Sequence, residues 1–107
     1  MLDKLRKVRD ALLTVTSDVS HYFAAKKTDQ YIVWMETGEA SSFRANNRKQ
    51  EQAIEGKIDY FTRTDFDHNV ESIQNALQEA EISYVLESVQ YEDDTGYIHY
   101  EWKFEVV

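Results

Sequence analysis

Three histidines, His21, His68 and His99, are the side chains of this 107-residue chain best suited to acid–base or metal chemistry. None belongs to an H-x-x-x-H or H-E-x-x-H pattern, so the spacing of a local zinc site is missing. His99 alternates with Glu101 on the polar side of a predicted strand, where acid–base catalysis would also require a cleft that holds a substrate. Ser20 and His21 are adjacent, and neighbours on a strand point to opposite faces, so they are not a nucleophile–base pair. We interpret His99 as an exposed or lightly paired residue.

Two groups of carboxylates offer oxygen ligands for a hard cation. Asp65, Asp67 and His68 crowd together, but they directly precede a helical pattern, and helix capping explains them more simply. Asp93 and Asp94 lack the spacing of an EF-hand loop and are typical of a solvated hairpin turn. The chain has no cysteine, no glycine-rich phosphate loop and no G-x-S-x-G motif. We therefore expect no enzymatic activity, no cofactor and no metal ion.

The charge of the chain is unevenly distributed along the sequence. The net charge is −8, and residues 1–50 hold nine Lys or Arg against six Asp or Glu, whereas residues 51–107 hold three against fourteen. One interpretation is that the asymmetry serves solubility alone. The other is that the protein has two oppositely charged surfaces, which suit head-to-tail self-assembly. A broad basic surface for nucleic acid is disfavoured in either case.

The hydrophobic pattern predicts the elements that must position these side chains. Apolar residues at helical spacing indicate a helix over about residues 3–16, with Asp3 as its cap, and a second helix that begins at Asp67 as its N-cap. A strand is predicted at residues 30–37, and its continuous apolar run over residues 31–35 is typical of a strand covered on both faces. Trp34 and Trp102 lie in such apolar strands and are expected to pack in the core rather than stack on a ligand. Further strands are predicted at residues 19–25, 52–62, 82–91 and 97–107.

This order predicts a single α+β domain over residues 1–107. The elements follow as α-β-β-β-α-β-β, and we expect a mainly antiparallel sheet with two helices packed on one face. Gly56, inside a predicted strand, indicates a bulge or a close approach of two backbones.

A long polar segment at about residues 38–51 breaks every periodic pattern. A connection of this length in a small domain is often functional or disordered. Phe43 is its only large apolar residue, and it either contacts another chain or folds back onto its own core. Tyr97 poses a similar choice, because a large aromatic on the polar side of a strand is either paired across strands or part of an interface. The interface candidates of the chain are Phe43, Arg44, Arg48, Lys49 and Tyr97.

Three segments together carry a family resemblance: YIVWMETGE at residues 31–39, QAIEGKIDYFT at residues 52–62 and TGYIHYEWKFEV at residues 95–106. Their order and spacing resemble small neck and tail proteins of tailed phages and prophages of Gram-positive bacteria, described as minor capsid, tail completion or tail terminator proteins. The element order is also similar to the tail-terminator, or tail-to-head joining, fold. The resemblance covers nearly the whole chain, although its motifs are strand sequences rather than chemical signatures.

The resemblance implies a structural protein of the virion, made in the host cytoplasm and placed at the head–tail junction. Such proteins assemble as rings, usually hexamers, that cap the tail tube and dock it to the head connector. DNA would pass through without specific binding, and no membrane would be involved. The resemblance transfers no catalytic residue. An acidic protein-binding module, including an inhibitor that imitates DNA, is the alternative function.

Overall fold

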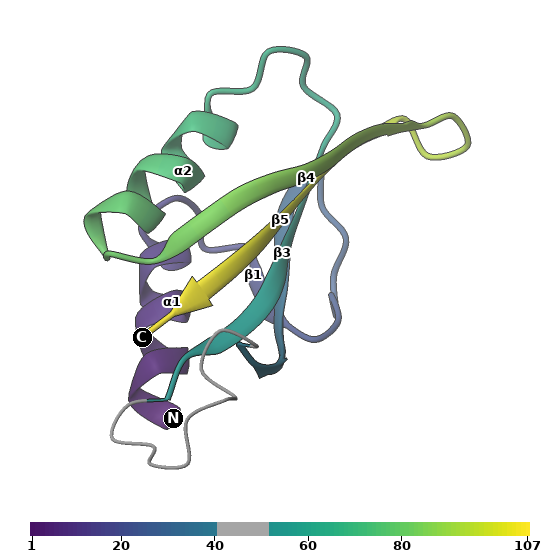
Figure 1. Cartoon of the computed structure of the whole chain (residues 1–107). Helices are drawn as coiled ribbons and strands as arrows, with labels where there is room; N and C mark the ends of the chain where they lie inside the picture. The colour runs from purple at the N-terminus through teal and green to yellow at the C-terminus, as the bar shows by residue number, and fades with distance from the viewer. Residues whose placement is uncertain (41–51) are drawn as a thin grey trace.

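The computed structural model describes residues 1–40 and 52–107, and these form one five-stranded sheet with two helices packed on one face (Figure 1). The predicted α+β class and element order are confirmed. The strand order is β1-β2-β3-β5-β4, with β1 parallel to β2 and every other pair antiparallel. The elements are α1 (Leu2–Leu13), β1 (Val19–His21), β2 (Gln30–Glu39), β3 (Ile54–Thr62), α2 (Asn69–Glu79), β4 (Ser83–Glu92) and β5 (Tyr97–Val106).

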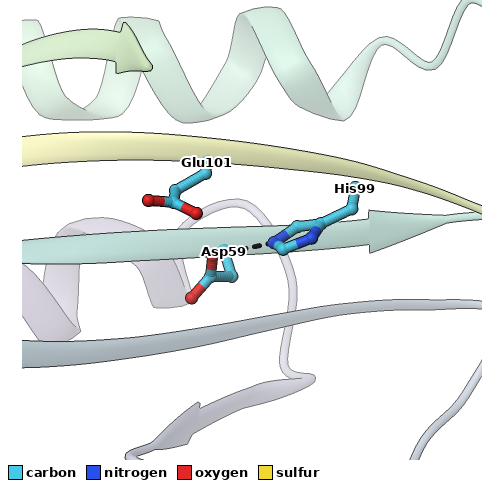
Figure 2. Close-up of side chains that lie close together, drawn as sticks. All are labelled: Asp59, His99 and Glu101. Carbon is cyan, nitrogen blue, oxygen red and sulfur yellow. Dashed lines mark hydrogen bonds and ion pairs between the residues drawn. The ribbon is translucent and has the colours of Figure 1, made fainter. Parts of the chain in front are cut away.

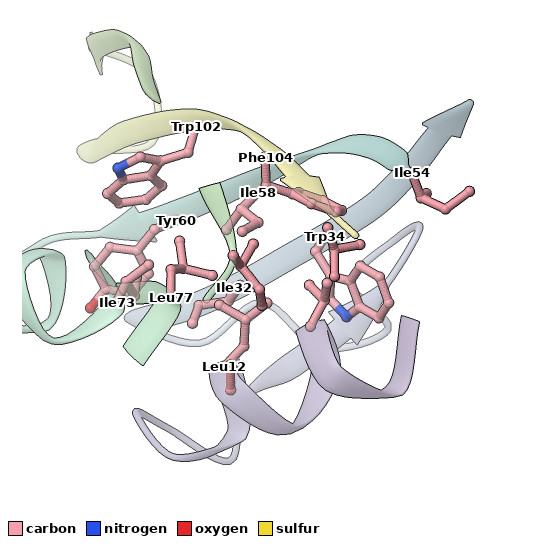
Figure 3. Packing of buried hydrophobic residues seen from close by; sticks show 14 residues of the cluster. Leu12, Ile32, Trp34, Ile54, Ile58, Tyr60, Ile73, Leu77, Trp102 and Phe104 are labelled. Carbon is pink, nitrogen blue, oxygen red and sulfur yellow. The ribbon is translucent and has the colours of Figure 1, made fainter. Parts of the chain in front are cut away.

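The main core lies between the inner face of the sheet and the two helices (Figure 3). Alternation along β5 turns Trp102 and Phe104 inward, and both are fully buried. Trp34 is likewise a core residue, as the sequence predicted. The helices close this layer with side chains at helical spacing: Val8, Ala11 and Leu12 from α1, and Ile73 and Leu77 from α2.

A second, smaller cluster covers part of the outer face of the sheet. Tyr31 and Val33 from β2 pack there against Tyr97 from β5, with Phe61 and Ala24 beside them. Strand β2 is therefore buried on both faces, which confirms the prediction from its continuous apolar run.

The ends of several elements differ from the sequence prediction. Helix α1 begins at Leu2, so its N-cap is Met1, and the prediction of Asp3 as cap is wrong; Asp3 instead pairs with Arg6 at 3.0 Å. The helix ends at Leu13, where the Thr14 hydroxyl donates a hydrogen bond to a carbonyl of the last turn. Strand β1 ends at His21, four residues early, because Tyr22 has a φ of +73° that no strand continues.

Strand β2 runs two residues into the segment predicted as a loop, to Glu39. Its register with β3 shifts between Glu36 and Gly38, directly opposite Gly56. A Cβ on Gly56 would clash with the carbonyl oxygen of Met35 and lie 2.6 Å from the Phe104 ring. Gly56 therefore marks a close approach of two strands, as expected, while the bulge lies in the neighbouring strand β2.

Candidate functional site

A cluster of ionisable side chains lies at the middle of the outer sheet face. The antiparallel register of β3 and β5 pairs Asp59 with Glu101 and Phe61 with His99, so all four side chains share this face. His99 Nε2 lies 2.8 Å from Asp59 Oδ1 (Figure 2). The Phe61 ring stacks on the imidazole at 4.2 Å between centroids, which holds the plane of His99.

Two further carboxylates surround this pair. The ligand atoms of Asp59, His99 and Glu101 all lie within 4.8 Å of one another. On the other side of the ring, Glu92 Oε2 at the end of β4 lies 3.6 Å from His99 Nδ1. Three acidic groups thus face a single imidazole.

The environment favours the charged form of His99. Its pKa is raised above the ordinary value chiefly by the hydrogen bond to Asp59, while burial opposes this shift and the charges of Asp59, Glu92 and Glu101 add to it. The side chain is 19 % exposed and that of Asp59 is 10 % exposed. The interpretation of His99 as an exposed or lightly paired residue is therefore wrong, since the imidazole is mostly buried and closely paired.

The sequence placed His99 and Glu101 on one polar strand face but did not bring Asp59 to them. His99 and Glu101 share one strand, and their alternation was visible. Asp59 comes from a strand forty residues earlier, and the adjacency of β3 and β5 required the sheet order. Chemically, the cluster offers one imidazole nitrogen and two carboxylates, a donor set that divalent first-row metals accept.

The other two histidines have separate environments. His21 Nε2 lies 2.6 Å from Glu36 Oε1, and its ring stacks on Trp34 and Tyr22. Burial alone would raise the pKa of Glu36, but hydrogen bonds from Tyr22 and His21 outweigh it and lower this pKa. His68 is exposed and is the N-cap residue of α2, without a side-chain capping bond.

Asp67 is occupied by internal hydrogen bonds. Its Oδ2 accepts bonds from the Tyr60 hydroxyl at 2.6 Å, the Thr62 hydroxyl at 2.7 Å and the Gln30 amide at 3.0 Å, and its Oδ1 accepts the backbone N–H of Asn69 at 2.9 Å. The N-cap prediction is off by one residue, although this carboxylate does bind the first amide of α2. Its donors support a structural role rather than a cation site.

Of the interface candidates, only Tyr97 lies within the described residues; Phe43, Arg44, Arg48 and Lys49 lie outside them. Tyr97 is 4 % exposed, and its hydroxyl donates a hydrogen bond to the Thr28 carbonyl at 2.6 Å. The Arg63 guanidinium lies 4.1 Å above the ring centre. Tyr97 is therefore paired within its own chain, and its ring is not exposed for contact with another chain.

An apolar groove lies between α1 and the first sheet edge. Its apolar walls include Leu2, Leu5 and Leu13, and Arg6 and Arg9 stand at its rim. The volume is about 310 Å³, and Val19, His21 and Trp34 complete the lining. We call this hollow the α1–β1 groove. Helix α1 carries four cationic and two acidic side chains, so the helix itself has a net positive charge.

The opposite sheet edge has a different character. Strand β4 exposes Val85, Leu86, Val89 and Tyr91, and we call these four residues the β4 patch. The hairpin that joins β4 to β5 extends beyond the helices (Figure 1). Its turn carries Asp93 and Asp94, and β4 itself contains two glutamates and no Lys or Pro. Strand β4, with its two glutamates, and helix α1, with its four cationic side chains, therefore come from opposite ends of the sequence.

A scan of the chain against protein-family models found no match, and a search of curated proteins also returned no matching sequence. Within residues 1–40 and 52–107, neither helix has the length and apolar character needed to cross a membrane.

Proposed function

We propose that this chain is a structural subunit of a head–tail neck ring of a tailed phage or prophage, most simply a tail terminator or tail-completion protein. The proposal combines the sequence resemblance with one structural observation. Strand β4 at one sheet edge exposes apolar side chains and contains two glutamates, and a groove lined by leucines and two arginines lies at the other edge.

The β4 patch supports a contact with another chain. An edge strand offers unpaired backbone groups, and monomeric proteins usually protect such edges with short strands, Lys or Pro. Strand β4 is ten residues long, has neither Lys nor Pro, and leaves Val89 and Tyr91 half or more exposed, while its pairing with β5 shifts register between Leu86 and Ser88. These exposed apolar side chains on an edge strand support a contact with a second chain.

In the proposed ring, the α1–β1 groove of one subunit would receive the β4 patch of the next subunit. Its leucines offer apolar area, and Arg6 and Arg9 at the rim would face the glutamates of an incoming β4. Contact between two different patches is heterologous, and repetition around an axis closes it into a ring. Two-fold pairing of β4 with β4 would instead bring together two strands that each carry Glu87 and Glu92, and like charges repel.

The oligomeric state tests this proposal. Light scattering with negative-stain microscopy, on the purified chain and in the presence of tail tubes, is expected to show rings of about six subunits. Val89→Lys should abolish them, because it places a charge in the apolar contact, whereas Asn75→Lys on the exposed side of α2 should leave them intact. A chain that stays monomeric under both conditions contradicts the proposal. Inhibition of a DNA-binding enzyme by that monomer would favour the acidic-module alternative.

A further inference from the structure

The cluster at the middle of the outer sheet face draws its three ligand residues from the inner strands β3 and β5. We propose that Asp59, His99 and Glu101 form a binding site for one divalent first-row cation, with Zn²⁺ as its natural probe. This inference does not rest on the ring function and goes beyond it.

The geometry of the ligand atoms supports the site. One imidazole nitrogen and two carboxylate oxygens lie within 4.8 Å of one another. Bonds of roughly 2.0–2.2 Å to zinc in a tetrahedral arrangement separate neighbouring ligands by about 3.4 Å. Binding would require the Glu101 and Asp59 side chains to adjust to that spacing, while β3 and β5 hold the backbones in continuous register from Ile54 to Thr62.

The surroundings resemble the outer shell of a metal site. His99 would bind the cation through Nε2, and Glu92 lies on the Nδ1 side at 3.6 Å, where a carboxylate commonly orients a metal-bound histidine. Phe61 holds the ring plane by stacking. The coordinating ring would therefore be oriented before a metal arrives.

The local charge favours a cation. Asp59, Glu92 and Glu101 oppose a single imidazole, so negative charge remains even when His99 carries a proton. Lys103, the next residue on this face of β5, lies 3.7 Å from Glu55 and so pairs away from the cluster. Asp59 is nine-tenths buried, which reduces the screening of these charges by water. A divalent cation would take the place of the imidazole proton and balance two carboxylates.

Zinc titration of the untagged full chain tests the site. Calorimetry is expected to show one Zn²⁺ per chain. Thermal unfolding should shift upward by several degrees with excess Zn²⁺ and return to its original midpoint with EDTA. The imidazole nitrogen resonances of His99 should change, and those of His21 and His68 should not. An unchanged His99 spectrum at saturating Zn²⁺ overturns the proposal.

Two variants separate the site from other surface ligands. Glu101→Gln removes a ligand that makes no hydrogen bond with Asp59 or His99, so it should fold normally and bind Zn²⁺ at least about tenfold more weakly. His21→Gln is the matched control, since His21 lies beside the single carboxylate of Glu36, and it should bind like the wild type. His99→Gln should lose binding altogether. Equal affinity of Glu101→Gln and wild type, or loss of binding in His21→Gln, contradicts the assignment.

Discussion

The imidazole of His99 lies 2.8 Å from the carboxylate of Asp59, although the two residues are forty positions apart in the sequence. Each comes from one of two neighbouring antiparallel strands, and the diagonal between register pairs places them together. The pair joins the centre of the sheet to β5 on the face away from the helices. Its strength in the metal-free protein can be measured directly.

A double-mutant cycle of Asp59→Asn and His99→Gln should give a coupling free energy of about 1–2 kcal/mol in EDTA at pH 6. The reason is that a mostly buried, charge-assisted hydrogen bond contributes more than an exposed ion pair. Urea unfolding of the four proteins provides the values. The same cycle on the exposed pair of Arg9 and Asp10 should give less than about 0.5 kcal/mol, and equal couplings would contradict the structural account.

Replacing Asp67 should reveal a pH-dependent contribution to stability. Burial by itself would raise the pKa of Asp67, but the hydrogen bonds from Thr62, Tyr60, Asn69 and Gln30 outweigh it and hold this pKa below its ordinary value. A carboxyl group with a lowered folded-state pKa stabilises the protein above its unfolded pKa of about 3.9, and loses this contribution as the pH falls through the folded value.

Asp67→Asn should therefore lower the free energy of unfolding by about 1–3 kcal/mol at pH 7, with a difference that shrinks below about pH 4. Urea unfolding across this pH range checks the result. Asp94→Asn, in the exposed hairpin turn, is the control and should change stability by less than about 0.5 kcal/mol. If the difference in the free energy of unfolding between Asp67→Asn and the wild type does not change with pH, this explanation is wrong.

Gly56→Ala should destabilise the protein by about 1–3 kcal/mol, because its new Cβ meets the Met35 carbonyl and the Phe104 ring at once. One of these neighbours is backbone, so rotation of a side chain cannot relieve the clash. Thermal unfolding should show a midpoint lowered by several degrees. Ser83→Ala, at the exposed start of β4, should leave the midpoint within about 2 °C of the wild type.

Charge reversal should disrupt the proposed ring and a second reversal should partly restore it. Arg6→Glu with Arg9→Glu places acidic groups at the α1–β1 groove, where they would repel the glutamates of β4 on the next subunit. Glu87→Lys on the same chain should recover part of the assembly. Sedimentation at low and high salt provides the readout, with rings expected to weaken as salt rises. If the wild type and the charge-reversed variants form rings equally well, the subunit contacts lie elsewhere.

Much of the fold was predictable because the local pattern and the tertiary environment agree. The alternation of β5 placed Trp102 and Phe104 inside before any neighbour was known, and the continuous run of β2 predicted cover on both faces. Element ends were less predictable. Nothing in the local pattern marks the positive φ of Tyr22 that stops β1, or the start of α1 ahead of Asp3.

The sequence by itself determined the class of the fold, the inward aromatic face of β5 and the separation of charge along the chain, since these depend on residue type and spacing alone. Only the tertiary structure decided that Asp59 meets His99 and Glu101, that Tyr97 is buried, and that β4 lies at an edge of the sheet. The physical reason is that strand order is set by pairing between distant segments. A side chain's face follows from local alternation, but its partner across the sheet depends on which strand lies beside it.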